Sequence, residues 1–310
     1  MYFLSDEERK KLLHYYLPKA RREGVAEELR GWNWSQPPLS PVYDCPLGVF
    51  EVASGYCSSS RDVYLRRVEG ARSKPNGAMF QGSLLHGLAA RFIVATKGLI
   101  YQEGVDGYRE ILRKLQEMTL SELLDEGLVF ELASLAEADR EELERKSRLL
   151  LEFERGRLIA RLQEALVKQP YIGEDALTAL AVPVVVEQKL DGSFLGLSAH
   201  LSADAYNIGQ PMIVEVKFGE PRDFHRLATA GYALVMEAVY EHPVDVGCLV
   251  CVTFKGDRVI IRRDIHLIDD ELRQWFVEAR DEKARMVYEE IDPGLAKDCP
   301  QSCPFANRCS

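Results

Sequence analysis

The spacing of apolar residues divides the chain into a helical first part and a strand-rich second part. Residues 5–30 predict a charged amphipathic helical region, and the connector GWNWSQPPLSP follows it. From about residue 47 to 170 the apolar residues recur at helical spacing. Residues 181–263 instead contain short runs rich in β-branched residues, which predict strands. One amphipathic helix at about 222–241 interrupts these strands, and a final helix is expected at about 269–289.

These elements predict an α/β fold, in which a mixed sheet carries packed helices and a helical region precedes the sheet. Within that helical region, Ser83 is a candidate N-cap and Gly98 a candidate helix end. We expect residues 47–310 to form one compact unit. The expected segments are an N-terminal helix and connector (1–46), a helical region (47–180), the sheet with its helices (181–290) and a cysteine tail (291–310).

Composition is that of a soluble globular protein, with 46% hydrophobic and 28% charged residues among 310. No stretch approaches the roughly 20 apolar residues that span a bilayer, and MYFLSDEERKK lacks the apolar core of a signal peptide. We therefore expect a cytoplasmic protein. The net charge of −10 argues against attraction of the whole surface to nucleic acid. Residues 55–75 are nevertheless locally basic, and Arg61, Arg66 and Arg67 are either phosphate contacts or part of a solvated helix face.

Three of the seven cysteines lie in the last twelve residues, at positions 299, 303 and 309 within the run DCPQSCPFANRCS. Cytoplasmic thiols bind metal more often than they form disulfides, although intracellular proteins of hyperthermophiles are an exception. Cys248 and Cys251 are expected on a strand, where residues three apart point to opposite faces, so they cannot chelate one ion together. The fourth ligand would then be a lone upstream cysteine. This one-plus-three spacing favours an iron–sulfur cluster and leaves zinc open.

Two carboxylates and a lysine form a second candidate site on the predicted strands. A hairpin through NIGQP would place Asp204 beside Glu215, and Lys217 shares the face of Glu215 while Val216 points away. Adjacent carboxylates repel unless a divalent cation neutralises them, and a lysine can stabilise a developing phosphate anion. Asp-x10-Glu-x-Lys is thus the skeleton of a metal-dependent phosphodiesterase site. The alternative is a solvated strand, but the flanking MIV and F favour a buried one.

Four motifs, GSLLHGLAARF, LSADAYN, IVEVKF and AGYALVMEAVYE, follow the order and spacing of the RecB-type nuclease motifs. With the terminal cysteines, the chain resembles the CRISPR-associated RecB-like iron–sulfur exonucleases. It is most similar to their archaeal type I-A branch, which shares the RGWNW and YCSSSRDVYLRR segments. The resemblance covers nearly the whole chain and implies a RecB-type, PD-(D/E)xK nuclease core with an iron–sulfur tail.

The resemblance also implies roles for individual residues. His86, Asp204, Glu215 and the Val216 carbonyl would bind Mg²⁺ or Mn²⁺, and Lys217 would be the catalytic lysine beside the two carboxylates. Without the resemblance, His86 could equally be a core histidine bonded to a backbone carbonyl. A 4Fe–4S cluster would be bound by Cys57, Cys299, Cys303 and Cys309.

At two points the match to the family pattern is ambiguous or incomplete. Cys45 competes with Cys57 as the fourth cluster ligand, and the resemblance favours Cys57 because it precedes the basic-aromatic run. The third nuclease motif usually has a glutamine four residues before its tyrosine, but here Ala228 precedes Tyr232. Tyr232 is a candidate DNA contact. His225 and Arg226, one helical turn away, are candidates to replace the missing glutamine.

The resemblance implies a metal-dependent exonuclease that trims DNA ends, single-stranded or with single-stranded parts, before their capture as CRISPR spacers. Its partners would be DNA and the CRISPR integrase proteins. The alternative is a scaffold of the acquisition complex, which binds DNA or the integrase and whose nuclease site is weak or inactive. Retention of the core residues favours the enzyme, whereas Ala228 and the acidic net charge favour the scaffold.

Overall fold

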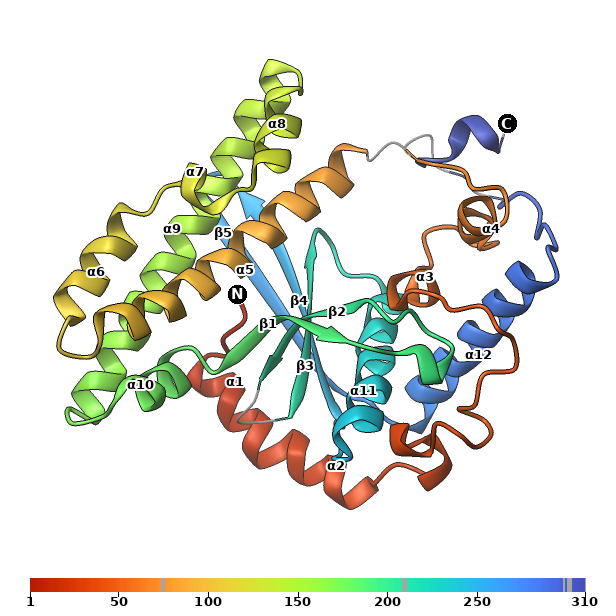
Figure 1. Ribbon diagram of the computed structural model, residues 1–310, viewed down its shortest axis with the longest axis horizontal. Helices are drawn as coiled ribbons and strands as arrows, with labels where there is room; N and C mark the ends of the chain where they lie inside the picture. Colours follow the sequence, from red (N-terminus) through yellow and green to blue (C-terminus); the bar gives the residue numbers. More distant parts are fainter. Residues whose placement is uncertain (74–75, 208–210, 298, 300–302, 310) are drawn as a thin grey trace.

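The centre of the protein is a five-stranded mixed sheet, seen in a computed structural model that describes residues 1–73, 76–207, 211–297, 299 and 303–309 (Figure 1). The strands lie side by side in chain order. They are β1 (Val184–Leu190), β2 (Leu201–Asn207), β3 (Met212–Phe218), β4 (Val246–Lys255) and β5 (Arg258–Leu267). Neighbouring strands run antiparallel except β3 and β4, which are parallel and therefore need a crossover connection.

Helices occupy most of the chain before the sheet. They are α1 (Asp6–Lys11), α2 (Leu17–Glu23), α3 (Val49–Ala53), α4 (Arg61–Arg67), α5 (Gly77–Glu103), α6 (Tyr108–Glu117), α7 (Leu120–Leu123), α8 (Glu126–Ala133), α9 (Glu137–Lys168) and α10 (Glu174–Ala181). Two more follow within and after the sheet, α11 (Leu227–Tyr240) and α12 (Asp270–Tyr288). A π-helical turn, Leu12–Tyr16, joins α1 to α2. Helix α11 is the crossover between β3 and β4, as the helix predicted at about 222–241 required.

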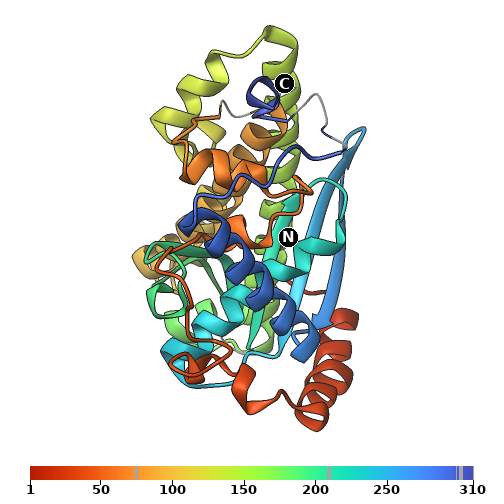
Figure 2. The same cartoon turned by 90° about the vertical axis from the view of Figure 1, so that its right-hand side faces the viewer.

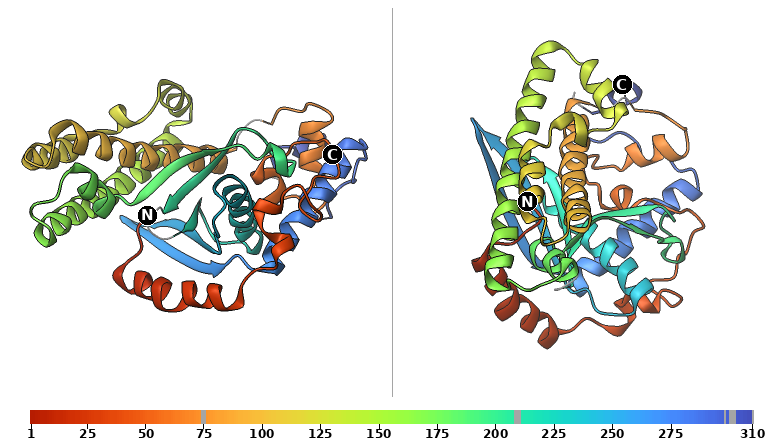
Figure 3. Two further views of the ribbon diagram at one scale, coloured as in Figure 1. Left: turned by 60° about the horizontal axis from the view of Figure 1, so that its bottom comes forward. Right: turned by 60° about the vertical axis from the view of Figure 1, so that its left-hand side comes forward.

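The sheet is covered by helices on both faces, as the two edge-on views in Figure 3 show. On one face, Phe92 of α5 and Leu158 of α9 share a core with Val214 of β3. On the other face, Phe276 of α12 packs in a second core with Ile213. Alternate residues of β3 thus serve opposite cores, because successive side chains of a strand point to opposite faces. The predicted α/β class is confirmed, with a mixed sheet between helical layers.

Helix α5 is longer than the sequence predicted. It begins after Asn76, which caps its first turn, and ends at Glu103. The predicted cap Ser83 and the predicted end Gly98 both lie inside the helix, so these two predictions are wrong. Apolar residues of α5 are buried in the core on both sides of those positions. This burial outweighs the local preference of serine and glycine for helix ends. By length and hydropathy α5 could cross a membrane, contrary to our expectation, but half of that stretch is buried, as in a core helix.

Strand β2 is shorter than predicted. The run SFLGLSAHLSADAYNI was expected to be extended throughout, yet Ser193–Leu195 form a 3-10 turn and the strand starts at Leu201. The turn NIGQP between β2 and β3 lies partly outside the described residues. Strand β3 has the bounds of the predicted run MIVEVKF.

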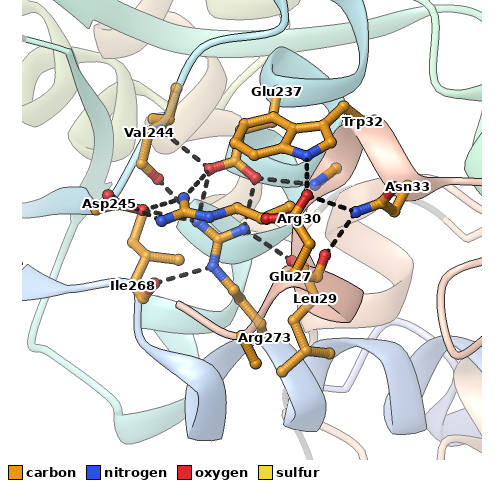
Figure 4. Close-up of polar contacts among 12 residues, drawn as sticks. Glu27, Leu29, Arg30, Trp32, Asn33, Glu237, Val244, Asp245, Ile268 and Arg273 are labelled. Carbon is orange, nitrogen blue, oxygen red and sulfur yellow. Dashed lines mark hydrogen bonds and ion pairs between the residues drawn. The ribbon is translucent and has the colours of Figure 1, made fainter. Parts of the chain in front are cut away.

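A buried ionic network joins the N-terminal connector to α11 and α12 (Figure 4). Glu237 of α11 accepts hydrogen bonds from the guanidinium groups of Arg30 and Arg273, at 2.7 and 2.8 Å. The Gly31 N–H donates to the same carboxylate at 2.9 Å, and Asp245 pairs with both arginines. The RGWNW segment is therefore held against the sheet layer by polar contacts as well as by packing.

Candidate active site

A cavity of about 1190 Å³ lies between α5, the sheet, α11 and the C-terminal tail. Figure 2 shows these elements from the side on which α4, α12 and the tail lie. One part of it is lined by the residues predicted for metal binding and catalysis, namely His86, Asp204, Glu215, Val216 and Lys217, and by the candidate DNA contact Tyr232. Another part is lined by Phe50, Tyr56, Cys57, Arg66, Cys299, Cys303 and Phe305. The structure thus brings both predicted sites to one cavity.

The cation-binding part forms where β2 and β3 separate. The register Ala205↔Val214 ends the described pairing, and one further step would place Asp204 opposite Glu215, as the sequence predicted. Asp204 Oδ2 instead accepts a hydrogen bond of 2.7 Å from the Val216 N–H. The N–H and C=O of a strand residue point to the same edge, so the Val216 carbonyl is directed toward this gap as well.

Lys217 and Glu215 form an ion pair within the gap, with Nζ 2.6 Å from Oε1. Glu215 is 5% exposed, and its other oxygen, Oε2, has no hydrogen-bond partner among the described residues. Burial lowers the pKa of Lys217, but the carboxylates of Glu215 and Asp204 outweigh burial and raise it above its usual range. Burial and the neighbouring Glu215 raise the pKa of Asp204. Without a cation, the gap therefore contains the adjacent carboxylates of Asp204 and Glu215, which repel each other, and the ammonium group of Lys217.

His86 extends from α5 toward the carboxylates. Its Nε2 lies 2.5 Å from Glu187 Oε1 and 3.5 Å from Asp204 Oδ1. Burial lowers the pKa of His86, but Asp204, Glu187 and Glu215 together raise it to about 9. The alternative of a core histidine bonded to a backbone carbonyl does not describe this residue, since its described partners are carboxylates.

Glu187 was missed by the sequence analysis. It lies on β1, and the hydrogen bond from His86 lowers its pKa to about 2 although burial opposes this. A signal was present in the run VVVEQKL, where one glutamate interrupts β-branched residues that predict a buried strand. The register of β1 on β2, Val186↔Ala205 and Gln188↔Ala203, sets Glu187 opposite Asp204. Finding it required that register.

The donor set fits a divalent cation. His86, Glu187 and Asp204 each offer one atom, all within 4.8 Å of one another, and no other such group occurs in the described part of the chain. Ligands about 2.1 Å from one small cation lie roughly 3 to 4 Å apart, so modest movements would satisfy one ion. The unpartnered Glu215 Oε2 offers a further oxygen. Oxygen donors with one imidazole suit Mn²⁺ or Mg²⁺ better than a soft metal.

The four cysteines implied as cluster ligands line a small adjoining cavity of about 70 Å³ together with Arg61 and Phe305. Cys45 does not line it and packs instead beside the core of α11 and α12. The structure therefore places Cys57, and not Cys45, with the terminal cysteines. Cys248 and Cys251 are buried within β4, as expected for ordinary core thiols.

Side-chain contacts attach the tail to the segment around α4. Arg61 forms two hydrogen bonds with Asp292, at 2.9 and 2.8 Å, and Ser59 donates to the Gly294 carbonyl at 2.9 Å. Phe305 packs against Leu65 in a small apolar cluster. These contacts would hold Cys57 near the terminal cysteines even without a bound cofactor.

The three basic candidates have different surroundings. The Arg61 guanidinium is paired with Asp292, and that of Arg67 forms a bidentate pair with Glu51. Arg66 lines the large cavity. Its guanidinium lies over the rings of Phe50 and Phe305 and forms a longer ion pair with Glu51, at 3.6 Å. Of the three, Arg66 has the position best suited to contact a ligand in the cavity.

The third nuclease motif lies on α11 and the turn before it. Ala228 and Tyr232 both line the cavity one helical turn apart, and burial raises the pKa of Tyr232. His225 also lines the cavity; its Nε2 lies 3.0 Å from the Tyr56 hydroxyl, and burial lowers its pKa to about 4. Arg226 instead pairs with Asp264, at 2.6 Å. Of the two candidates to replace the missing glutamine, only His225 is at the cavity among the described side chains.

The chain matches the family model of CRISPR-associated exonuclease Csa1 over residues 1–310. It belongs to this family. A curated relative from Saccharolobus solfataricus, named CRISPR-associated exonuclease Csa1, is 37% identical over 294 residues, or 94% of each chain. A relative of the same name from Thermoproteus tenax is 30% identical over 285 residues, or 92% of this chain and 91% of that protein. No solved structure gives a significant match.

Membership in this exonuclease family confirms the resemblance found in the sequence, and it supports a nuclease role in CRISPR. The family name indicates an exonuclease but does not say whether cleavage depends on a metal ion.

Proposed function

We propose that the protein is a metal-dependent DNA exonuclease with a RecB-type core and a 4Fe–4S cluster, which processes DNA ends for CRISPR spacer acquisition in the cytoplasm. One observation carries the nuclease assignment. His86, Asp204, Glu215 and Lys217 come from three different elements and converge on one cavity. A purely structural role does not explain why Asp204 and Glu215 lie side by side. Lys217 pairs with one oxygen of Glu215, and the other oxygen is buried without a partner among the described residues.

A Mn²⁺ or Mg²⁺ ion held by His86, Asp204, Glu215 and the Val216 carbonyl would polarise the scissile phosphate and activate a water molecule. The protein's own contribution is to fix these donors. Asp204 is held by the Val216 N–H and Glu215 by Lys217. The donors therefore need little reorganisation when the ion binds, which is the electrostatic basis of catalysis at such sites.

Lys217 acts as a cation and not as a general base. The carboxylates beside it raise its pKa above its usual range, so the ammonium form dominates at neutral pH. Positioned next to Glu215 in the cavity, the ammonium group would stabilise the negative charge that develops on the phosphate.

The cavity suits a single-stranded DNA end. Its 1190 Å³ exceed the usual 300–1,000 Å³ range of small-molecule sites and leave room for more than one nucleotide. Phe50 and Tyr56 are 63% and 65% exposed and line the cavity, where they offer surfaces on which bases stack. Arg66 supplies a positive charge beside them.

The spacing of the cysteines supports a cluster over zinc. Zn–S bonds of about 2.3 Å place two thiolates of a tetrahedral site about 3.8 Å apart. Among the described residues, the four thiols are not part of any group of three donors close enough to share one ion. An iron–sulfur cluster, whose own iron and sulfide atoms lie between the thiolates, spans such a wider arrangement.

The assignment is tested by incubating anaerobically purified protein with end-labelled single-stranded DNA and Mn²⁺. Lys217→Ala should lower the cleavage rate by about 100-fold or more while Mn²⁺ still binds, because lysine acts on the phosphate and not on the ion. Lys255→Ala, which removes an exposed lysine at the end of β4, is the matched control and should cleave normally.

The second candidate function is the non-catalytic scaffold. Ala228 favours it, because this residue lines the cavity where the motif usually has a glutamine. In that case the wild-type protein would bind DNA or the integrase under reducing, metal-replete conditions but leave labelled DNA intact. Such a result would overturn the exonuclease proposal.

A further inference from the structure

We propose that Glu187 is itself a ligand of the divalent cation, so that the site comprises one imidazole and three carboxylates. This inference rests on the proposed function only in assuming that a cation binds at His86 and Asp204. The metal ligands implied by the sequence motifs do not include Glu187, which lies on a strand that carries none of those motifs.

The first argument is position. The Glu187 carboxylate is the closest described partner of His86 Nε2, at 2.5 Å, whereas Asp204 lies at 3.5 Å. Any ion that binds His86 through Nε2 must enter at the point where Glu187 Oε1 now sits. The carboxylate must then either leave the site or bind the ion.

The second argument is that Glu187 is held from behind. Its other oxygen, Oε2, accepts a hydrogen bond of 2.8 Å from the Ser202 hydroxyl, which in turn accepts one of 3.0 Å from Lys189 Nζ. These contacts fix the carboxylate with Oε1 toward His86. They favour its staying in place as a ligand when the ion enters.

The third argument is the backbone. Glu187 has φ = +52° inside β1, a left-handed conformation that residues other than glycine rarely adopt. The residues on either side, Val186 and Gln188, pair regularly with β2, but Glu187 itself is absent from the ladder. Strained conformations of this kind persist where a side chain must be held in a particular place, and here the strain directs the carboxylate to His86.

The fourth argument is charge. Asp204, Glu187 and Glu215 carry three negative charges when ionised, and Lys217 carries one positive charge. Lys189 lies 3.7 Å from Glu187 Oε2 but is exposed, so solvent screens its charge and it is not counted within the site. With His86 neutral, as metal binding requires, the site has a net charge of −2. One divalent cation neutralises it, and without Glu187 the loaded site would be positive.

The test measures Mn²⁺ binding, independently of nuclease activity. Free Mn²⁺ is followed by electron paramagnetic resonance, and water bound to the protein-held ion by water-proton relaxation. For Glu187→Gln we expect binding at least about 10-fold weaker, with one additional water on the ion in place of the lost carboxylate. Glu187→Asp should recover part of the affinity. Gln188→Ala, at the neighbouring half-buried position of β1, is the matched control and should bind as the wild type does.

Two results would overturn the proposal. If Glu187→Gln binds Mn²⁺ as tightly as the wild type, Glu187 is not a ligand. If binding weakens but the number of bound waters stays the same, Glu187 only positions His86. Circular dichroism identifies a misfolded variant, in which case Glu187→Asp carries the comparison. Failure of the wild-type protein to bind Mn²⁺ would instead remove the cation from the proposed function.

Discussion

The charge state of His86 couples cation binding to pH. In the cation-free protein the surrounding carboxylates raise its pKa to about 9, so the imidazole is protonated at neutral pH and bonded to Glu187. A metal ion binds only the neutral imidazole and must displace that proton. Proton and cation therefore compete for one nitrogen atom.

We predict that the cation-free protein loses stability as pH rises from about 6.5 to 9. The folded-state pKa of His86 lies above its ordinary value of about 6.5, so its contribution is complete below pH 6.5 and disappears as pH passes 9. The loss should reach about 3 kcal/mol at most. Urea unfolding at pH 6 and pH 9 in the presence of a chelator measures it.

Two controls separate this effect from general pH dependence. His86→Gln should lack the loss between pH 6.5 and 9, and saturating Mn²⁺ should remove it from the wild type because the bound imidazole carries no extra proton. An equal pH dependence in His86→Gln and wild type would contradict the assignment.

Arg66 is the single basic side chain that we expect to matter most for DNA. Arg66→Ala should weaken binding of single-stranded DNA and reduce the slope of log affinity against log salt by about 0.7, because one phosphate contact is lost. Arg61→Ala is the comparison, since that guanidinium is paired with Asp292. Fluorescence anisotropy at several salt concentrations provides the measurement. A larger effect at Arg61 than at Arg66 would move the phosphate contact to the start of α4.

At the scale of elements, one side of α11 lines the cavity and another side takes part in the buried ionic network. Ala228 and Tyr232 line the cavity, while Glu237, one turn further on, is buried among the guanidinium groups of Arg30 and Arg273. The Gly31 backbone approaches α11 so closely that an added Cβ would lie 2.0 Å from a carbonyl oxygen of the helix. The N-terminal connector thus fixes the helix that forms the cavity wall.

We predict that Glu237→Gln lowers the free energy of unfolding by about 3–5 kcal/mol, because Asp245 would remain as the single carboxylate facing two buried guanidinium groups. The connector should also become sensitive to protease near residue 30. Denaturant unfolding and limited proteolysis check both effects. Glu152→Gln, at an exposed position of α9, is the matched control and should change stability by less than about 0.5 kcal/mol. Equal stability of the two variants would show that the network contributes little.

At the scale of the whole molecule, the cysteine site links parts of the chain that are far apart in sequence. A cluster bound by Cys57 and Cys299 would close a loop of roughly 240 residues, which by analogy with a disulfide stabilises the fold by about 5 kcal/mol. The site adjoins the large cavity, since Cys57, Cys299 and Cys303 line both. Loss of the cluster should therefore loosen one wall of the DNA site.

We predict that Cys57→Ser abolishes the brown colour and the roughly four irons per chain expected of a cubane cluster. The variant should melt at lower temperature, with α4 and the tail cut first by protease. Cys45→Ser is the matched control and should keep both colour and stability, because Cys45 does not line the cysteine cavity. Stoichiometric zinc without iron in the wild type would overturn the cluster. Loss of iron from Cys45→Ser alone would reassign the fourth ligand.

The sequence by itself determined features that depend on neighbours along the chain. The run of apolar, mostly β-branched residues predicted the bounds of β3, and the two-residue spacing placed Glu215 and Lys217 on one face. The short connection between β2 and β3 implied that Asp204 would come opposite Glu215. These are local consequences of strand geometry, in which side chains alternate with a period of two.

The tertiary structure decided what depends on contacts between distant segments. Glu187 joined the site because the β1–β2 register sets it opposite Asp204 and because α5 crosses β1 with His86 facing that point. The ends of α5 moved beyond Ser83 and Gly98 because burial against the sheet outweighs local capping preference. Local charge does not distinguish Arg61, Arg66 and Arg67. In the structure Arg61 pairs with Asp292 and Arg67 forms the shorter, bidentate pair with Glu51, whereas Arg66 has a longer ion pair and faces the cavity. In each case a contact made only in the folded chain decided the outcome, and no local pattern contains that contact.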